Sequence, residues 1–106
     1  MADLAPLLEH ITGLLTNRPA DPGKPFVTEM EDTLTDGYAR ALQLESERLR
    51  IERRIATLAH NADGPEAAEE LKTLAAKLRD VDVAIDGLRG QLGALQKHLE
   101  EVRAAA

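Results

Sequence analysis

Apolar residues recur at alternating three- and four-residue intervals through the C-terminal half of the chain, from Leu71 to Val102. This interval is the a and d spacing of a coiled coil, in which one face of a helix packs against a partner helix. The same spacing occurs upstream, from Met30 to Leu58. The pattern therefore predicts two long helices, each with one apolar seam. The seam positions are Met30, Leu34, Gly37, Ala41, Leu44, Arg48, Ile51, Ile55 and Leu58, then Leu71, Leu74, Leu78, Val81, Ile85, Leu88, Leu92, Leu95, Leu99 and Val102.

A short turn separates the two runs. It contains Asn61 and Gly64, either of which can take the left-handed conformation found at helix ends. In an antiparallel pair, facing residues have numbers with a constant sum. Leu58 and Leu71 sum to 129, as do the other facing seam positions, and the midpoint of 64.5 falls in the turn. The expected fold is all-α, a long antiparallel coiled-coil hairpin over residues 28–106.

Residues 1–27 form a second region, an amphipathic helix followed by a proline- and glycine-rich linker. The helix is predicted over residues 3–16 with Asp3 as its cap. Its apolar face carries Leu4, Leu7, Leu8, Ile11, Leu14 and Leu15. The linker contains Pro19, Pro22, Gly23 and Pro25. Thr28 with Glu31 fits a capping box, so the second helix is expected to begin there. A helix as short as the first is marginal alone, so it must dock on something.

Leu42, Leu49 and Ala56 flank the seam of the second helix and widen its apolar face beyond what one partner helix covers. Either the N-terminal helix or a second hairpin can cover this flank. We expect a second copy, which gives a homodimeric four-helix bundle. The N-terminal helix then docks on its own chain or exchanges onto the neighbour.

Arg48 interrupts the seam opposite Val81. The expected arrangement is a packed aliphatic stem with the charged head paired to a nearby carboxylate, from Glu45, Glu52, Asp80 or Asp82. A second interpretation is a buried polar residue that fixes register or oligomeric state. A third is an arginine that binds a small ligand. Arg48 also belongs to an arginine-rich segment with interleaved glutamates, which predicts surface ion pairs or, alternatively, an acidic protein partner. The arginines are Arg48, Arg50, Arg53 and Arg54.

Gly87 and Gly90 lie inside the third helix, on a stripe of small residues between Val83 and Ala94. Each glycine costs up to about 1 kcal/mol relative to alanine in a helix interior. The stripe is either a solvated face, a place where the N-terminal helix or a partner approaches closely, or a small-ligand pocket.

Composition limits the function classes. The chain has 106 residues, enough for one domain, and a net charge of −6, which opposes general nucleic-acid binding. It contains no cysteine, which fits a reducing compartment. No apolar run is long enough for a membrane span, and the start of the sequence lacks the features of a signal peptide. A soluble cytoplasmic protein without membrane or nucleic-acid partners is the expectation.

No catalytic, metal or cofactor site is expected. His10, His60 and His98 are isolated, and no histidine lies near Ser46 in the hairpin. The pattern is similar in shape to small bacterial helical-hairpin adaptors and regulators, although shape does not fix function. We expect a non-enzymatic protein–protein interaction module, an adaptor or regulatory subunit, whose partners are a second copy and another protein. The alternatives are an anti-sigma-like regulator that binds a small ligand at a helical dimer interface, and a structural coiled-coil assembly protein.

Overall fold

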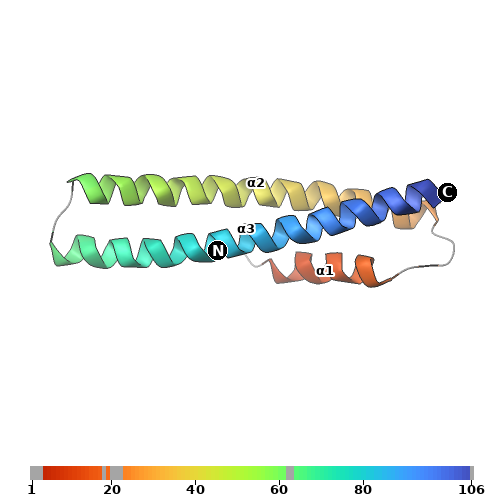
Figure 1. The fold of residues 1–106 in the computed structure, drawn as a ribbon, viewed down its shortest axis with the longest axis horizontal. Coiled ribbons are helices and arrows are strands. Elements are labelled where there is room, and N and C mark those ends of the chain that lie inside the picture. Colours follow the sequence, from red (N-terminus) through yellow and green to blue (C-terminus); the bar gives the residue numbers. More distant parts are fainter. Residues whose placement is uncertain (1–3, 18, 20–22, 62–63, 106) are drawn as a thin grey trace. The chain divides into compact units, whose positions relative to one another are not determined.

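The computed structural model describes residues 4–17, 19, 23–61 and 64–105, and their regular structure is entirely helical. The helices are α1 (Ala5–Thr16), α2 (Lys24–Asn61) and α3 (Pro65–Ala105), shown in Figure 1. The predicted all-α hairpin with a short N-terminal helix is confirmed. No helix in the described part is both long and apolar enough to cross a membrane.

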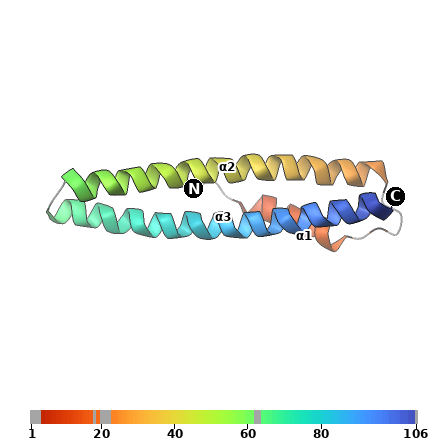
Figure 2. The ribbon, with the colours of Figure 1, turned by 45° about the horizontal axis from the view of Figure 1, so that its top comes forward.

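The chain divides into two compact units. The two-helix unit comprises residues Leu42–Asp86, and the three-helix unit comprises Met1–Ala41 together with Gly87–Ala106. Within each unit, the segments of α2 and α3 run antiparallel (Figure 2). The three-helix unit also contains α1.

The two-helix unit has the predicted seam as its core. Its buried apolar side chains include Leu44 and Ile51 on α2, and Val81 and Ile85 on α3. Nearer the turn, α3 is only half-buried at Leu71, Leu74 and Leu78. This part of α3 therefore stays partly open to solvent, although Leu58 of α2, close to the same turn, is 5 % exposed. The seam assignment is nevertheless confirmed, since the buried side chains Leu44, Ile51, Leu58, Val81 and Ile85 of this unit all lie at seam positions.

The turn uses Gly64 as expected. Its φ of 102° lies in the left-handed region that favours glycine. The Gly64 carbonyl accepts a hydrogen bond of 3.2 Å from the N–H of Ala68, and Pro65 opens α3. Proline suits a first helical position because its missing N–H would have no partner there.

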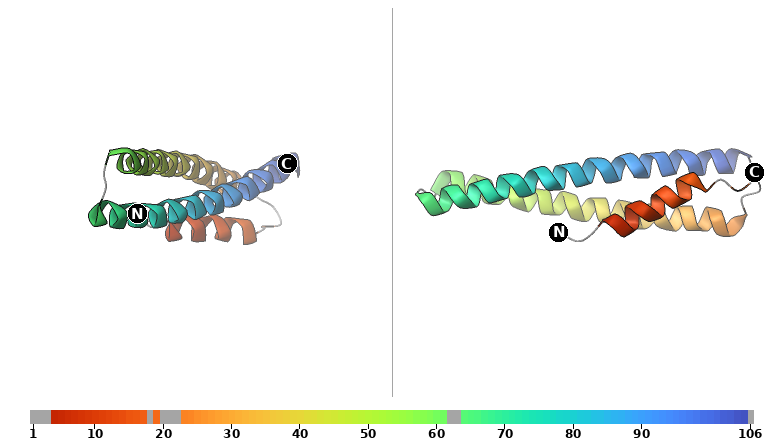
Figure 3. Two further views of the ribbon diagram at one scale, coloured as in Figure 1. Left: turned by 60° about the vertical axis from the view of Figure 1, so that its left-hand side comes forward. Right: turned by 90° about the horizontal axis from the view of Figure 1, so that it is seen from below.

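The three-helix unit has the more completely buried core. Met30, Leu88, Leu92 and Leu95 are all 0 % exposed. In the views of Figures 1 and 3, α1 lies beside the first part of α2 and the last part of α3. Ile11 of α1 is 0 % exposed and Leu14 is 8 % exposed, so α1 docks on its own chain through its apolar face.

The predicted helix starts need correction. α2 begins at Lys24, so Thr28 lies inside the helix and the capping box is wrong. Instead, the carbonyl of Gly23 accepts the N–H of Val27 at 3.3 Å, and Pro25 occupies the first turn. Pro25, which the sequence pattern placed in the linker, therefore belongs to the first turn of α2. α1 begins at Ala5 without a side-chain cap, and Asp3 lies outside the described residues.

Gly37 permits a close approach of α2 and α3 in the three-helix unit. A Cβ atom added at Gly37 would lie 3.3 Å from Cγ and 3.4 Å from Cδ1 of Leu92, and would overlap Cδ2 of the same side chain. The seam sum of 129 pairs these two residues. Glycine occupies this seam position because the side chain of Leu92 leaves no room for a Cβ atom.

Candidate interaction surface

An apolar stripe on α2 of the two-helix unit faces solvent. We call Leu42, Leu49 and Ala56 the α2 stripe. Leu42 is 63 % exposed and Leu49 is 46 % exposed, and Ala56 is exposed as well. Residues seven apart lie on one side of a helix, so the three side chains project from the same face. Single exposed leucines are ordinary, but here two lie in line beside a buried seam and form a continuous apolar strip.

Arg48 closes the side of the stripe that adjoins α3. Its Nε lies 2.9 Å from Oε1 of Glu52 and 3.0 Å from Oδ1 of Asp82 on α3. The side chain is 47 % exposed, whereas Val81 opposite is 1 % exposed, as expected if the stem of Arg48 covers it. The predicted surface pairing is confirmed. The interpretation of Arg48 as a buried polar residue is wrong, because its charged head lies at the surface.

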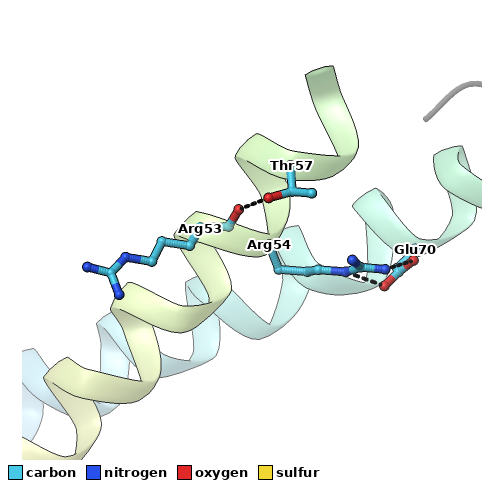
Figure 4. Close-up of polar contacts among 4 residues, drawn as sticks. All are labelled: Arg53, Arg54, Thr57 and Glu70. Carbon is cyan, nitrogen blue, oxygen red and sulfur yellow. Dashed lines mark hydrogen bonds and ion pairs between the residues drawn. The ribbon is translucent and has the colours of Figure 1, made fainter. Parts of the chain in front are cut away.

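A second cross-helix pair lies nearer the turn. Nε of Arg54 donates to Oε1 of Glu70 at 3.0 Å, and Nη2 donates to Oε2 at 3.2 Å (Figure 4). This two-pronged hydrogen bond, together with the charge of Glu70, raises the pKa of the Arg54 guanidinium. Arg54 is therefore charged at any working pH, and the pair is an exposed link between α2 and α3.

Two other arginines of α2 remain uncompensated. Arg50 and Arg53 are exposed, and neither forms an ion pair with any described residue. In Figure 4 the guanidinium of Arg53 points to the opposite side from that of Arg54. The backbone carbonyl of Arg53 accepts a hydrogen bond from the hydroxyl of Thr57 at 3.0 Å. The outer side of the α2 stripe therefore carries unpaired positive charge on a chain whose net charge is −6.

The candidate residues of α1 pack within the three-helix unit of their own chain. Ile11 and Leu14 are buried, and Leu7 and Leu8 are half-buried. Nε2 of His10 lies 2.6 Å from Oε1 of Glu29 on α2, an exposed polar contact beside the apolar one. In the docked arrangement, this apolar face is occupied by the three-helix unit.

The glycine stripe is a solvated face. Gly87 and Gly90 are exposed, and a Cβ added at either would meet nothing within 4 Å. The interpretation that the N-terminal helix docks on these glycines is therefore wrong. Val83 on the same stripe is 72 % exposed. Nothing in the described chain requires the small size of Gly87 or Gly90.

One buried polar residue was not anticipated. His98 is 6 % exposed, and neither ring nitrogen has a hydrogen-bond partner among the described residues. Its ring meets Phe26 edge-on at a centroid distance of 6.2 Å and an interplanar angle of 77°. Position 98 directly precedes the seam residue Leu99, a location beside the seam that could have indicated burial by a third helix.

The described residues contain no group of three or more metal-ligating side chains. The candidate surface thus consists of the α2 stripe, two cross-helix ion-pair groups and two arginines without ion pairs among the described residues. Comparison with known proteins finds no matching family, no similar curated protein and no similar solved structure.

Proposed function

We propose that the chain is a non-enzymatic interaction module, a cytoplasmic adaptor or regulatory subunit, that binds a helix of another protein on the α2 stripe. The observation that carries the proposal is the exposure of Leu42 and Leu49, at 63 % and 46 %, beside a seam whose neighbours Leu44 and Ile51 are buried. An apolar helix face without a partner in its own chain is a surface that another helix can cover.

The surroundings of the stripe favour binding with little rearrangement. Arg48 joins Glu52 on its own helix to Asp82 on α3, and Arg54 joins Glu70. Such cross-helix contacts hold the face in one geometry before a partner arrives, which reduces the ordering cost of association. Complete burial of one leucine contributes about 1.5–3 kcal/mol, so two partly exposed leucines support a modest, reversible affinity.

The homodimer expected from the sequence concerns the same surface. A second hairpin on the α2 stripe would complete a four-helix arrangement in the two-helix unit. A second copy and a different protein are therefore competing occupants of one face, and the mass of the protein in solution separates them.

A photoreactive amino acid placed at Leu49 tests the proposal in cells. The matched control carries it at Val83, which is 72 % exposed but belongs to α3 and not to α2. We expect discrete crosslinked species from position 49, identified by mass spectrometry, and none of the same species from position 83. Identical patterns from both positions, or no protein crosslinked at position 49, would contradict the proposal.

A further inference from the structure

We infer that the helix received by the α2 stripe is acidic: an amphipathic helix with apolar residues seven apart and carboxylates along one edge. The inference rests on the proposed function, because it names the chemistry of the partner for that same surface. It follows from the charges that are left over around Leu42 and Leu49 after the intrachain pairs are formed.

Two anionic groups of α2 near the stripe are already engaged, whereas Glu47 has no partner among the described residues. Glu52 is bound by Arg48 at 2.9 Å. Glu45, two turns earlier on the same helix, also takes part in an interaction. A partner with basic side chains would have to displace these contacts, and it would gain little over the existing pairs.

The cationic groups on the outer side are not engaged. Arg50 and Arg53 are exposed and have no ion pair in the described parts of the chain. Arg53 follows Leu49 by four residues, so it lies one turn along from that leucine on the same side of the helix. An arginine in this position offers a planar fork of donors that binds a carboxylate through two hydrogen bonds.

The spacing defines the partner further. Leu42 and Leu49 are separated by seven residues, about 10 Å along a helix at 1.5 Å per residue. A partner helix that covers both leucines needs apolar residues at the same interval, with glutamate or aspartate on the edge that faces Arg50 and Arg53. A second copy fits less well, because two facing stripes bring four uncompensated arginines to one interface.

Two synthetic helical peptides test the inference on the full-length chain. Both carry leucine at seven-residue intervals, and they differ only in having glutamate or lysine at the flanking positions. Binding is measured by fluorescence anisotropy at low and high salt. Since the chain carries a net charge of −6, long-range attraction alone would favour the lysine peptide. Preference for the glutamate peptide is therefore an effect of the local arginines.

The expected result is that the glutamate peptide binds about fivefold to tenfold more tightly at low salt, the effect of two exposed charge pairs, and that high salt reduces the preference. In the double variant Arg50→Glu, Arg53→Glu the preference should reverse. The control variant Arg79→Glu, which changes one exposed arginine on α3, should keep it. Folding of each variant is checked by circular dichroism.

The outcomes separate the two proposals. Equal binding of both peptides, lost in Leu42→Ser, Leu49→Ser, would overturn the acidic partner and leave the docking function intact. Absence of binding by either peptide would contradict both. A dimeric mass in solution that becomes monomeric in the same double serine variant would identify a second copy as the occupant and overturn the acidic partner.

Discussion

The same substitution, glycine to alanine, should have different effects on stability at two positions of the three-helix unit. At Gly87 an added Cβ meets nothing within 4 Å, whereas at Gly37 it overlaps Cδ2 of Leu92. Both glycines lie inside helices, at exposed and buried sites respectively. The intrinsic gain in helix propensity, about 1 kcal/mol, is common to both and cancels in the comparison.

The difference in stability between the two variants therefore measures the steric cost of placing a methyl group against Leu92. Leu92 is 0 % exposed, so its methyl group can move only by disturbing packed neighbours. Overfilling a packed core costs about 1–3 kcal/mol. Gly87→Ala should then stabilise the protein by about 1 kcal/mol, and Gly37→Ala should leave it unchanged or destabilise it by up to about 2 kcal/mol.

Thermal and urea unfolding followed by circular dichroism measure this difference. For a domain of this size, 1 kcal/mol corresponds to about 4–8 °C in Tm, so the two variants should differ by at least about 4 °C. Gly90→Ala, also at an open site, should behave like Gly87→Ala. Equal stabilisation at positions 37 and 87 would refute the close approach of α2 and α3 at Gly37.

Three further predictions concern the seam, the buried histidine and α1. Leu88→Ala should cost roughly 2–4 kcal/mol, since Leu88 is 0 % exposed, whereas the exposed Lys72→Ala should cost less than about 0.5 kcal/mol; similar small values in urea unfolding would refute the seam assignment. His98→Leu should raise the free energy of unfolding by about 1 kcal/mol, because it removes two buried nitrogens without partners. A fall in stability would refute the argument that the two unpaired nitrogens destabilise the core. Ile11→Asp places a charge at a fully buried position and should release α1, seen as loss of amide protection over residues 5–16 in hydrogen exchange; unchanged protection there would contradict the docking.

The seam was predictable because two independent signals agree on it. The apolar spacing from Met30 to Leu58 and from Leu71 to Val102 defines the helices, and the constant sum of 129 defines their register. The start of α2 was not predictable from the prolines alone. Pro25 is compatible with both a linker and a first helical turn, and only the hydrogen bond from Val27 to Gly23 distinguishes them.

The candidate surface was predictable only in part. Leu42 and Leu49 stood out as apolar residues beyond the seam, and they are exposed. Which arginines stay unpaired depends on the neighbouring helix. Arg48 and Arg54 pair with carboxylates on α3, while Arg50 and Arg53 form no ion pair with any described residue. The order of charges along α2 alone does not show which arginines meet a carboxylate of α3.

The half-buried leucines of the two-helix unit make amide hydrogen exchange in this unit sensitive to whether another helix covers it. Leu71, Leu74 and Leu78 have one partner helix, whereas Leu88 and its neighbours in the three-helix unit are enclosed. Opening a segment that exposes less new apolar surface requires less free energy, so its amides exchange with solvent sooner. The backbone around residues 71–78 should thus exchange early in the free protein, and later if the proposed partner helix covers the two-helix unit. Mass spectrometry of unmodified protein can follow binding through these amides, without a label on either partner.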